Sequence, residues 1–336
     1  MKMFIALTIA IVLIASLSSC AQQSVFNVTT STENEAINTQ KIKVLIVDGQ
    51  NNHAVWPKAT VMMKTYLEES GLFDVDVYRT KLIWRGESEL HYLKMYNTPE
   101  HQLVEEPATD ATFAPPFVRY DVVVSNFGYR AADWPQQTQS AFESYIQNGG
   151  ALVSVHAANN SFAQWTQYNQ MTGLGGWGGR DERWGPYVYF SDDGKLIRDT
   201  SKGAAGAHGT KHEFQITQRN EHPILQGFPK VWMHTKDECY GNLRGPADNM
   251  MILASALCPK AEKGTGKHEP ILMVLNYGKG RVFHTTLGHQ QESYESVGFI
   301  TTFLRGTEWA ATGRVTQAVP YDFPSETRSS SRPFLN

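Results

Sequence analysis

The chain has 336 residues, with 30 basic and 33 acidic side chains and a net charge of −3. No basic run or stripe departs from this balance, so the sequence lacks the electrostatic footprint of a nucleic-acid-binding protein. Three cysteines are too few for a disulfide scaffold, and they show neither C-x-x-C nor zinc-type Cys/His spacing.

The first residues carry the features of an export signal. Lys2 precedes an apolar stretch over residues 4–15, which is shorter than the roughly 18–20 residues that span a bilayer. The following Leu17-Ser-Ser-Cys20 resembles a bacterial lipobox, which predicts a signal peptide over residues 1–20 and lipidation of Cys20. The alternative is an ordinary secretory signal with an incidental cysteine. Residues 21–40 are polar and predict a flexible tether. We therefore expect an exported protein anchored to the membrane by lipid, by default on the periplasmic face of the outer membrane.

Beyond the tether, strand-like and helix-like segments alternate, which predicts an α/β domain with a mainly parallel sheet and helices on both faces. The expected strands are residues 43–48, 73–78, 120–126, 151–156, 212–218, 250–256, 271–276 and 282–286. The expected helices are residues 56–70, 135–148 and 299–311. The last two strands flank a glycine-containing turn and predict a C-terminal antiparallel hairpin. The segments 81–118 and 157–210 are expected to be irregular, and the polar tail 313–336 to be loosely attached.

Polar residues stand where several predicted strands end. His53 follows the first strand, Asn126 ends the third, His156 ends the fourth, and His289 follows the hairpin. Ligands of open α/β sheets bind beyond the carboxyl ends of the strands, so we expect these side chains on one rim. The alternatives are that His156 is a hydrogen-bonded core histidine and that His53 caps the helix after it.

Carboxylates and aromatic residues add to the candidate site. Asp237 and Glu238 are neighbours, and in an extended segment they point to opposite sides, so one of them is expected to face the site. His212, which opens a strand, is a further candidate. Trp177 lies in a glycine-dense loop with Trp184, and these rings could stack on a sugar or pack the loop.

Other histidines and cysteines carry weaker expectations. His222 precedes a proline and is expected to be structural, and four histidines in loops need no function: His91, His101, His208 and His268. Cys239 and Cys258 could pair in an oxidising periplasm or remain buried thiols. His156, His289 and His53, together with a carboxylate, could hold a divalent metal that their separate loops bring together.

Several motifs resemble one known family. The segment Gly149-Gly-Ala-Leu-Val-Ser-Val-His156 resembles the strand-to-helix elbow of class I glutamine amidotransferases, with histidine in place of the cysteine nucleophile. Without that thiolate we expect no amidotransferase activity. The same segment is similar to ThuA-like (trehalose utilisation) proteins, where histidine is expected. Further matches follow in order: His222-Pro-Ile, Asp237-Glu-x-Tyr240, Gly280-Arg-Val-Phe, Leu287-Gly-His289 and Gly306-Thr-Glu-Trp309-Ala. The resemblance covers residues 41–312.

The resemblance implies a flavodoxin-like, class I glutamine amidotransferase-like fold and a role on a glycoside, or on a 3-keto-glycoside such as 3-keto-trehalose. It also implies a sugar-oxidising dehydrogenase in the same pathway. We expect His156 or Glu238 to act as base, His289 to act as acid or enolate stabiliser, and Asp237 to belong to the same catalytic set. His53, Asn126 and Tyr240 are expected to orient the sugar, together with His212 and Trp177.

Two other functions remain open. A hydrolase of unoxidised sugars would need two facing carboxylates, whereas Asp237 and Glu238 are adjacent in the sequence. A non-catalytic lipoprotein that binds a sugar or a partner protein would fit the aromatic residues and the tether.

Overall fold

The computed structural model describes residues 40–335, in which strands and helices alternate as the sequence predicts. The predicted signal peptide, Cys20 and the tether up to residue 39 lie outside the described residues. Within the described part, no helix is both long enough and apolar enough to cross a bilayer.

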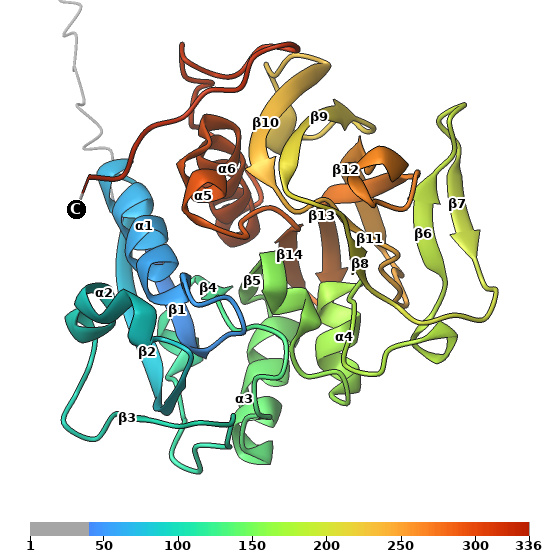
Figure 1. The fold of residues 1–336 in the computed structure, drawn as a ribbon. Helices are drawn as coiled ribbons and strands as arrows, with labels where there is room; N and C mark the ends of the chain where they lie inside the picture. Colours follow the sequence, from blue (N-terminus) through green and yellow to red (C-terminus); the bar gives the residue numbers. More distant parts are fainter. Residues whose placement is uncertain (1–39, 336) are drawn as a thin grey trace, which may run out of the picture. The chain divides into compact units, whose positions relative to one another are not determined.

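One half of the sheet is parallel. Its strands are β1 (Ile42–Gln50), β2 (Phe73–Trp84), β3 (Gln102–Leu103), β4 (Val122–Ser125), β5 (Ala151–Val155) and β14 (Gly280–Thr285). They lie in the order β3-β2-β1-β4-β5-β14, with each neighbouring pair parallel (Figure 1). From β2 to β14 this is the flavodoxin-like order, in which the order of successive strands reverses between β1 and β4.

The sheet continues as an antiparallel half. Its strands are β13 (His268–Tyr277), β12 (Met250–Leu257), β9 (His212–Gln218) and β10 (Val231–Asp237), which extend the sheet from β14 in that order. The predicted hairpin is confirmed as β13–β14. β10 was not predicted, because its mixed sequence VWMHTKD shows no clear apolar alternation.

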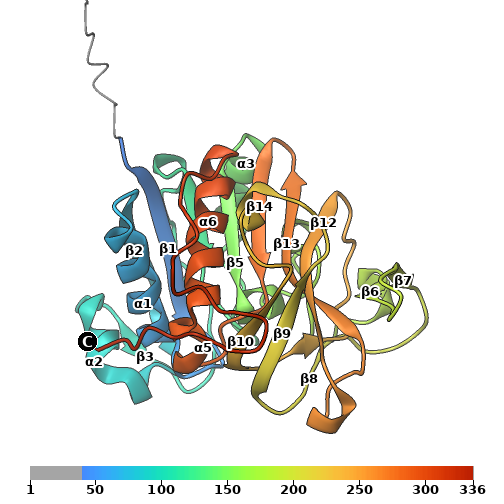
Figure 2. The same ribbon diagram turned by 90° about the horizontal axis from the view of Figure 1, so that it is seen from above.

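Short strands attach to this half. β6 (Tyr187–Phe190) and β7 (Leu196–Asp199) pair with each other, and β6 also pairs with β13. Figure 2 shows this hairpin at the edge of the molecule far from β1 and β2. β8 (Ala207–His208) and β11 (Tyr240–Gly241) form a separate two-stranded ribbon.

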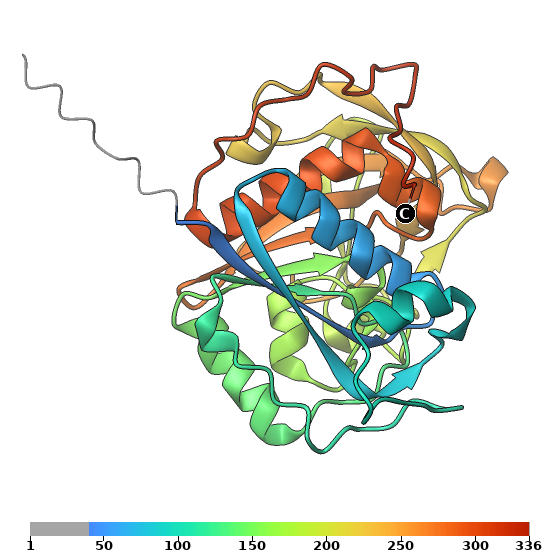
Figure 3. The ribbon, with the colours of Figure 1, turned by 90° about the vertical axis from the view of Figure 1, so that its left-hand side faces the viewer.

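Helices cover both faces of the parallel strands. α1 (Trp56–Glu69) and α6 (Val297–Thr312) lie side by side on one face (Figure 3), and α3 (Gln136–Gln147) and α4 (Thr166–Thr172) lie on the other. The two shorter α-helices are α2 (Leu90–Met95) and α5 (Gln291–Glu295). The 3-10 turns are η1 (Glu87–Glu89), η2 (Phe117–Arg119), η3 (His156–Asn160), η4 (Glu182–Trp184), η5 (Pro223–Leu225) and η6 (Lys260–Glu262).

The first strand shows why its sequence is apolar without interruption. Val44 and Ile46 pack in a cluster with side chains of α1 and α6, whereas Leu45 and Val47 pack with side chains of α3 and α4. All four are at most 1% exposed. A strand that is buried on both faces must be apolar at every position, and not only at alternate ones.

The C-terminal tail is not loosely attached, and that expectation is wrong. Val319 and Phe323 pack against the main core cluster, and the backbone N–H of Met233 donates to the carbonyl oxygen of Ser325 at 2.8 Å. The segment 157–210 is also more regular than expected, because it contains α4, β6, β7 and β8. Isolated apolar anchors and two-residue strands leave no periodic signal in a sequence.

Candidate functional site

Three histidines from distant parts of the chain meet beyond the carboxyl ends of the parallel strands. His53 follows β1, His156 follows β5 and His289 follows β14. The ring centroids are 4.9 Å apart for His53 and His156, 4.7 Å for His53 and His289, and 5.6 Å for His156 and His289. Strands that run in parallel end on the same edge of a sheet, and this shared edge brings the three rings together.

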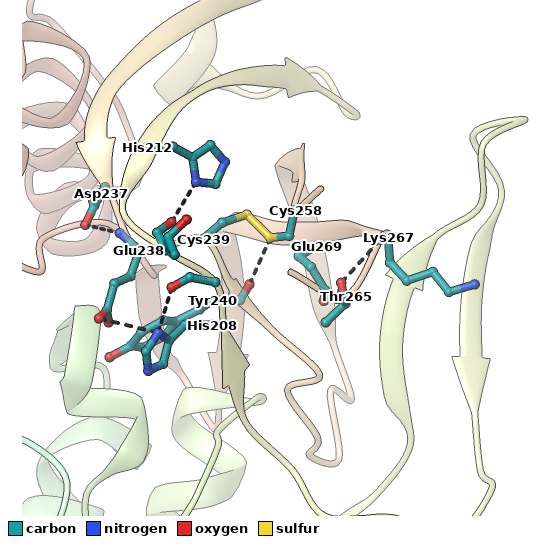
Figure 4. The surroundings of a disulfide bond; sticks show 12 residues. His208, His212, Asp237, Glu238, Cys239, Tyr240, Cys258, Thr265, Lys267 and Glu269 are labelled. Atoms are coloured by element: carbon teal, nitrogen blue, oxygen red, sulfur yellow. Dashed lines mark hydrogen bonds and ion pairs between the residues drawn. A yellow bond between two sulfur atoms is a disulfide. The ribbon is translucent and has the colours of Figure 1, made fainter. Parts of the chain in front are cut away.

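Glu238 brings a carboxylate to these rings from the antiparallel half of the sheet, where it follows β10. Its Oε1 lies 3.1 Å from Nε2 of His289 and 3.5 Å from Nδ1 of His208, and its Oε2 lies 4.0 Å from Nε2 of His156. The side chain is 11% exposed. Figure 4 shows the Glu238 carboxylate pointing to His208. The site therefore consists of one carboxylate and four imidazoles: His53, His156, His208 and His289.

His208 was expected to have no function, yet the structure places it next to Glu238. It lies in β8, directly opposite Tyr240 of β11. Its side chain is 45% exposed, so it forms the solvent side of the cluster. A two-residue strand has no sequence signature, and the pairing of β8 with β11 could not be read from either segment alone.

His156 is held in a strained turn. Its φ of 46° lies in the left-handed region, which non-glycine residues rarely adopt, and such strain is concentrated at functional sites. Nδ1 lies 2.7 Å from the carbonyl oxygen of Thr286 and must donate to it. Nε2 is therefore the acceptor atom, and it is buried without a hydrogen-bond partner. Burial lowers the pKa of His156 to about 4.

His53 turns its ring towards the cluster and does not cap α1. The residue before α1 is Val55, and the helix start has no side-chain cap. Asn51 orders the loop, because its Oδ1 accepts from the backbone N–H of His53 at 2.9 Å. Burial, followed by the nearby imidazoles of His156 and His289, holds the pKa of His53 far below its ordinary value. Its Nδ1 is buried without a partner.

Asp237 makes its side-chain hydrogen bonds to backbone N–H groups and to His234, a histidine outside the four-imidazole cluster. Oδ1 accepts from the N–H groups of Glu238 at 2.8 Å and His289 at 3.1 Å. Oδ2 accepts from Gly288 N–H at 2.9 Å and from His234 Nε2 at 3.0 Å. Burial alone would raise the pKa of Asp237, but these bonds, above all that from His234, hold it well below its usual range. Asp237 thus ties the loop that carries His289 to the segment that carries Glu238.

Aromatic rings line one side of the cluster. The Tyr240 ring lies 4.3 Å from that of His156, and the Trp177 ring lies 5.0 Å from Tyr240 and 5.9 Å from His208. Trp184 has a different place: its indole N–H donates to the carbonyl oxygen of Ala163 at 2.9 Å, and it lines a separate cavity of about 370 Å³. Of the two tryptophans in the glycine-dense loop, Trp177 is therefore the one at the site.

Two other predicted residues make their hydrogen bonds elsewhere. The side-chain amide of Asn126 donates to the carbonyl oxygen of Trp56 at 3.0 Å and to Oγ1 of Thr60 at 2.9 Å. It therefore joins β4 to α1. His212 turns Nδ1 to the carbonyl oxygen of Thr210 at 2.8 Å, and Figure 4 shows its ring on the side away from the Glu238 carboxylate. The structural expectation for His222 agrees with its contacts, because its side chain accepts from Ile224 N–H within η5.

The site is poorly solvated, and this shifts the protonation of its main pair. Burial raises the pKa of Glu238 to about 7, while burial also lowers the pKa of His289. Shifts of both partners towards neutrality, in residues at strand ends, are typical of functional sites.

Cys239 and Cys258 form a disulfide (Figure 4). Cys239 stands between Glu238 and Tyr240, so the bond attaches this site segment to the end of β12. The sequence left open whether Cys239 and Cys258 pair or remain buried thiols, and in the structure they are paired.

Comparisons with known proteins agree with this fold. A family model described as trehalose utilisation (ThuA) matches residues 43–310. The crystal structure of a ThuA-like protein from Parabacteroides merdae is 40% identical, with 87% of this chain and 98% of that chain covered and a TM-score of 0.76. A ThuA-like protein from Bacteroides uniformis is 16% identical, with 82% and 92% covered and a TM-score of 0.50, and it supports the fold alone. No curated protein matches the chain.

Proposed function

The chain belongs to the ThuA (trehalose utilisation) family, and we propose that it is an enzyme of carbohydrate metabolism that cleaves a 3-keto-glycoside such as 3-keto-trehalose. The observation that carries the proposal is the convergence of Glu238 and four imidazoles beside the Trp177 ring. Neutral sugar binding alone would not require several histidines. Proton transfer does use them, because a neutral imidazole has one nitrogen that accepts a proton and one N–H that donates.

The proposed reaction is an elimination that starts from the ketone at C3. The C2–H bond breaks, its proton passes to a base, and the electron pair forms the C2–C3 enolate. The enolate then returns to the ketone as the C1–O bond breaks, which leaves a C1–C2 double bond and puts the electron pair on the leaving oxygen. An acid protonates this oxygen, and water added across C1 and C2 gives the free 3-keto sugar. The step requires one base, one acid and a group that stabilises the enolate.

The base in this proposal is His289. When its Nε2–H donates to Glu238 Oε1, its Nδ1 keeps a lone pair, and Nδ1 is buried without a partner. Glu238 then holds the tautomer and orientation of the ring, as carboxylates do for histidine bases. His208, the exposed imidazole beside Trp177, is suited to protonate the leaving oxygen. This assignment differs from the sequence-based hypothesis, which gave the base to His156 or Glu238.

Asp237 is a positioning residue in this proposal. All four of its hydrogen bonds go to protein groups, so it acts through the backbone of Glu238 and His289. The same observation argues against a glycosidase with two facing carboxylates, because only one member of the pair faces the imidazoles.

The decisive assay offers trehalose and 3-keto-trehalose side by side to the full-length chain, with sugar release followed by mass spectrometry. Release from the keto compound alone supports the proposal, and loss of that release in His289→Ala supports the assigned base. Release from trehalose itself would favour the ordinary hydrolase. Binding of either sugar without turnover would favour a sugar-binding lipoprotein.

Two related proposals concern the setting of the enzyme. A 3-keto substrate requires a preceding dehydrogenase-type oxidation of a sugar hydroxyl.

Export is supported by the Cys239–Cys258 disulfide, since such bonds persist in oxidising compartments. We expect Cys20 to carry the lipid and the periplasmic face of the outer membrane to hold the protein. Membrane fractionation of cells that express the chain or Cys20→Ala tests this, and equal release of both into the soluble fraction would contradict it.

A further inference from the structure

The nitrogen and oxygen atoms at the centre of the cluster are spaced as ligands and not as hydrogen-bond partners. His53, His156 and Glu238 each offer one ligand atom, and these atoms all lie within 4.8 Å of one another. The separation of 4.0 Å between His156 Nε2 and Glu238 Oε2 is too long for a hydrogen bond. Two atoms that each bind a cation at about 2.0–2.2 Å lie up to about 4.4 Å apart, so a small inward shift closes the set.

We propose that His53, His156 and Glu238 bind a divalent transition-metal cation, at a site that stays open towards His289 and His208. Two imidazoles and one carboxylate are a known donor set for catalytic zinc and for non-haem iron, with remaining positions free for water or substrate. The sequence-based hypothesis named His156, His289 and His53 with an unspecified carboxylate, whereas the geometry leaves His289 out and identifies the carboxylate as that of Glu238. The proposal deepens the proposed function. Binding of the metal is independent of that function, but the metal's role in catalysis rests on it.

The surroundings of His156 have the form of a metal ligand's second shell. Ligating histidines donate their other ring nitrogen to a carbonyl or a carboxylate, which fixes the tautomer. His156 does this through Nδ1 and the carbonyl oxygen of Thr286 at 2.7 Å. The opposite atom, Nε2, faces Glu238 and is buried with no hydrogen-bond partner. A buried acceptor without a partner is costly in a folded protein, and a bound cation would remove that cost.

Glu238 divides its two oxygens between two tasks. Oε1 is the oxygen nearest to His289 and His208, and Oε2 is the one that faces His156. Coordination through Oε2 therefore leaves the hydrogen bond to His289 in place. His289 and His208 remain free for proton transfer, and the cation would stabilise negative charge on the substrate's ketone oxygen.

We assign Nδ1 as the ligand atom of His53, because this nitrogen is also buried without a partner. Its other nitrogen, Nε2, faces the side-chain nitrogen of Asn52 at 3.3 Å. Coordination through Nδ1 puts the proton on Nε2, so the Asn52 amide must then turn its oxygen to the ring. This rotation would break the present hydrogen bond, in which Asn52 Oδ1 accepts from Tyr129 N–H at 2.9 Å.

Metal content gives a test that needs no activity. The full-length chain is stripped with chelator, dialysed against Zn²⁺, Mn²⁺ or Co²⁺, and measured by inductively coupled plasma mass spectrometry and calorimetry. We expect one cation per chain. We also expect His53→Ala, His156→Ala and Glu238→Gln each to weaken binding by more than about 100-fold, since loss of a second-shell partner alone weakens binding by 10–100-fold.

Two control variants separate a specific site from general affinity for histidine. His208→Asn removes a cluster member outside the ligand set and should retain one cation, as should the surface variant His91→Asn. Failure of the wild-type chain to bind any of the three cations, or equal weakening in His208→Asn and His156→Ala, overturns the proposal. Turnover by the chelator-stripped chain would overturn a catalytic role for the metal. The same result would leave the proposed function intact. One bound cation without turnover of a keto-glycoside supports the site and argues against the proposed function.

Discussion

Replacing Asp237 by asparagine tests whether this carboxylate holds the site together. In the wild-type chain its oxygens accept four hydrogen bonds, three from backbone N–H groups and one from His234. Asparagine keeps one oxygen and turns an NH₂ group towards two of these donors, so two of the four bonds are lost. A hydrogen bond to a charged group contributes about 1.5–3 kcal/mol. We therefore expect Asp237→Asn to lower the free energy of unfolding by about 3–6 kcal/mol.

Urea denaturation followed by circular dichroism measures this loss. The matched control is Asp121→Asn, where an exposed carboxylate accepts one backbone N–H from Lys43 at 2.8 Å. Its expected loss is less than about 1 kcal/mol, as for most surface substitutions. Losses below about 1 kcal/mol for both variants would refute the positioning role of Asp237.

Activity gives a second readout of the same substitution. Asp237 fixes the backbone of Glu238 and His289, and its remaining hydrogen bonds go to Gly288 N–H and His234. At a temperature at which Asp237→Asn is still folded, we expect kcat for the keto-glycoside to fall at least about 10-fold with little change in KM. A purely structural role would leave kcat of the folded fraction unchanged.

Four further predictions follow from the structure. Glu238→Gln should lower kcat/KM by about 100-fold or more, and turnover within twofold of wild type would exclude a proton-transfer role for the pair it forms with His289. Trp177→Ala should raise KM by up to about 10-fold while Trp184→Ala should not, and equal KM values would show that Trp177 does not contact the sugar. Reduction of the Cys239–Cys258 disulfide, which closes a loop with a sequence separation of 19, should destabilise the fold by about 3 kcal/mol in urea unfolding. Burial raises the pKa of Glu269 from 4.5 to about 7, so its stabilising contribution is present below pH 4.5 and is lost as pH rises to 7, by about 3 kcal/mol. Glu269→Gln should lack this loss, and identical pH profiles of unfolding for the two chains would contradict it.

Local sequence patterns determined the α/β class, the parallel strands and the polar residues at their ends. The strand over residues 43–48 could be recognised because burial on both faces demands an unbroken apolar run. His156 could be placed at a functional turn because the run over residues 151–155 stops abruptly at a histidine. Once these strands were taken as parallel, His53, His156 and His289 had to lie on one edge of the sheet.

Only the tertiary structure decided which side chains complete the site. Glu238 follows β10 of the antiparallel half, His208 lies in β8 of the separate two-stranded ribbon, and neither strand has a readable periodicity. The roles of the neighbours Asp237 and Glu238 could not be separated either. The sequence predicts that their side chains point to opposite sides, but it does not indicate which one faces the histidines. Periodicity reports which faces of a segment are buried, whereas the partner that buries them is set by long-range packing.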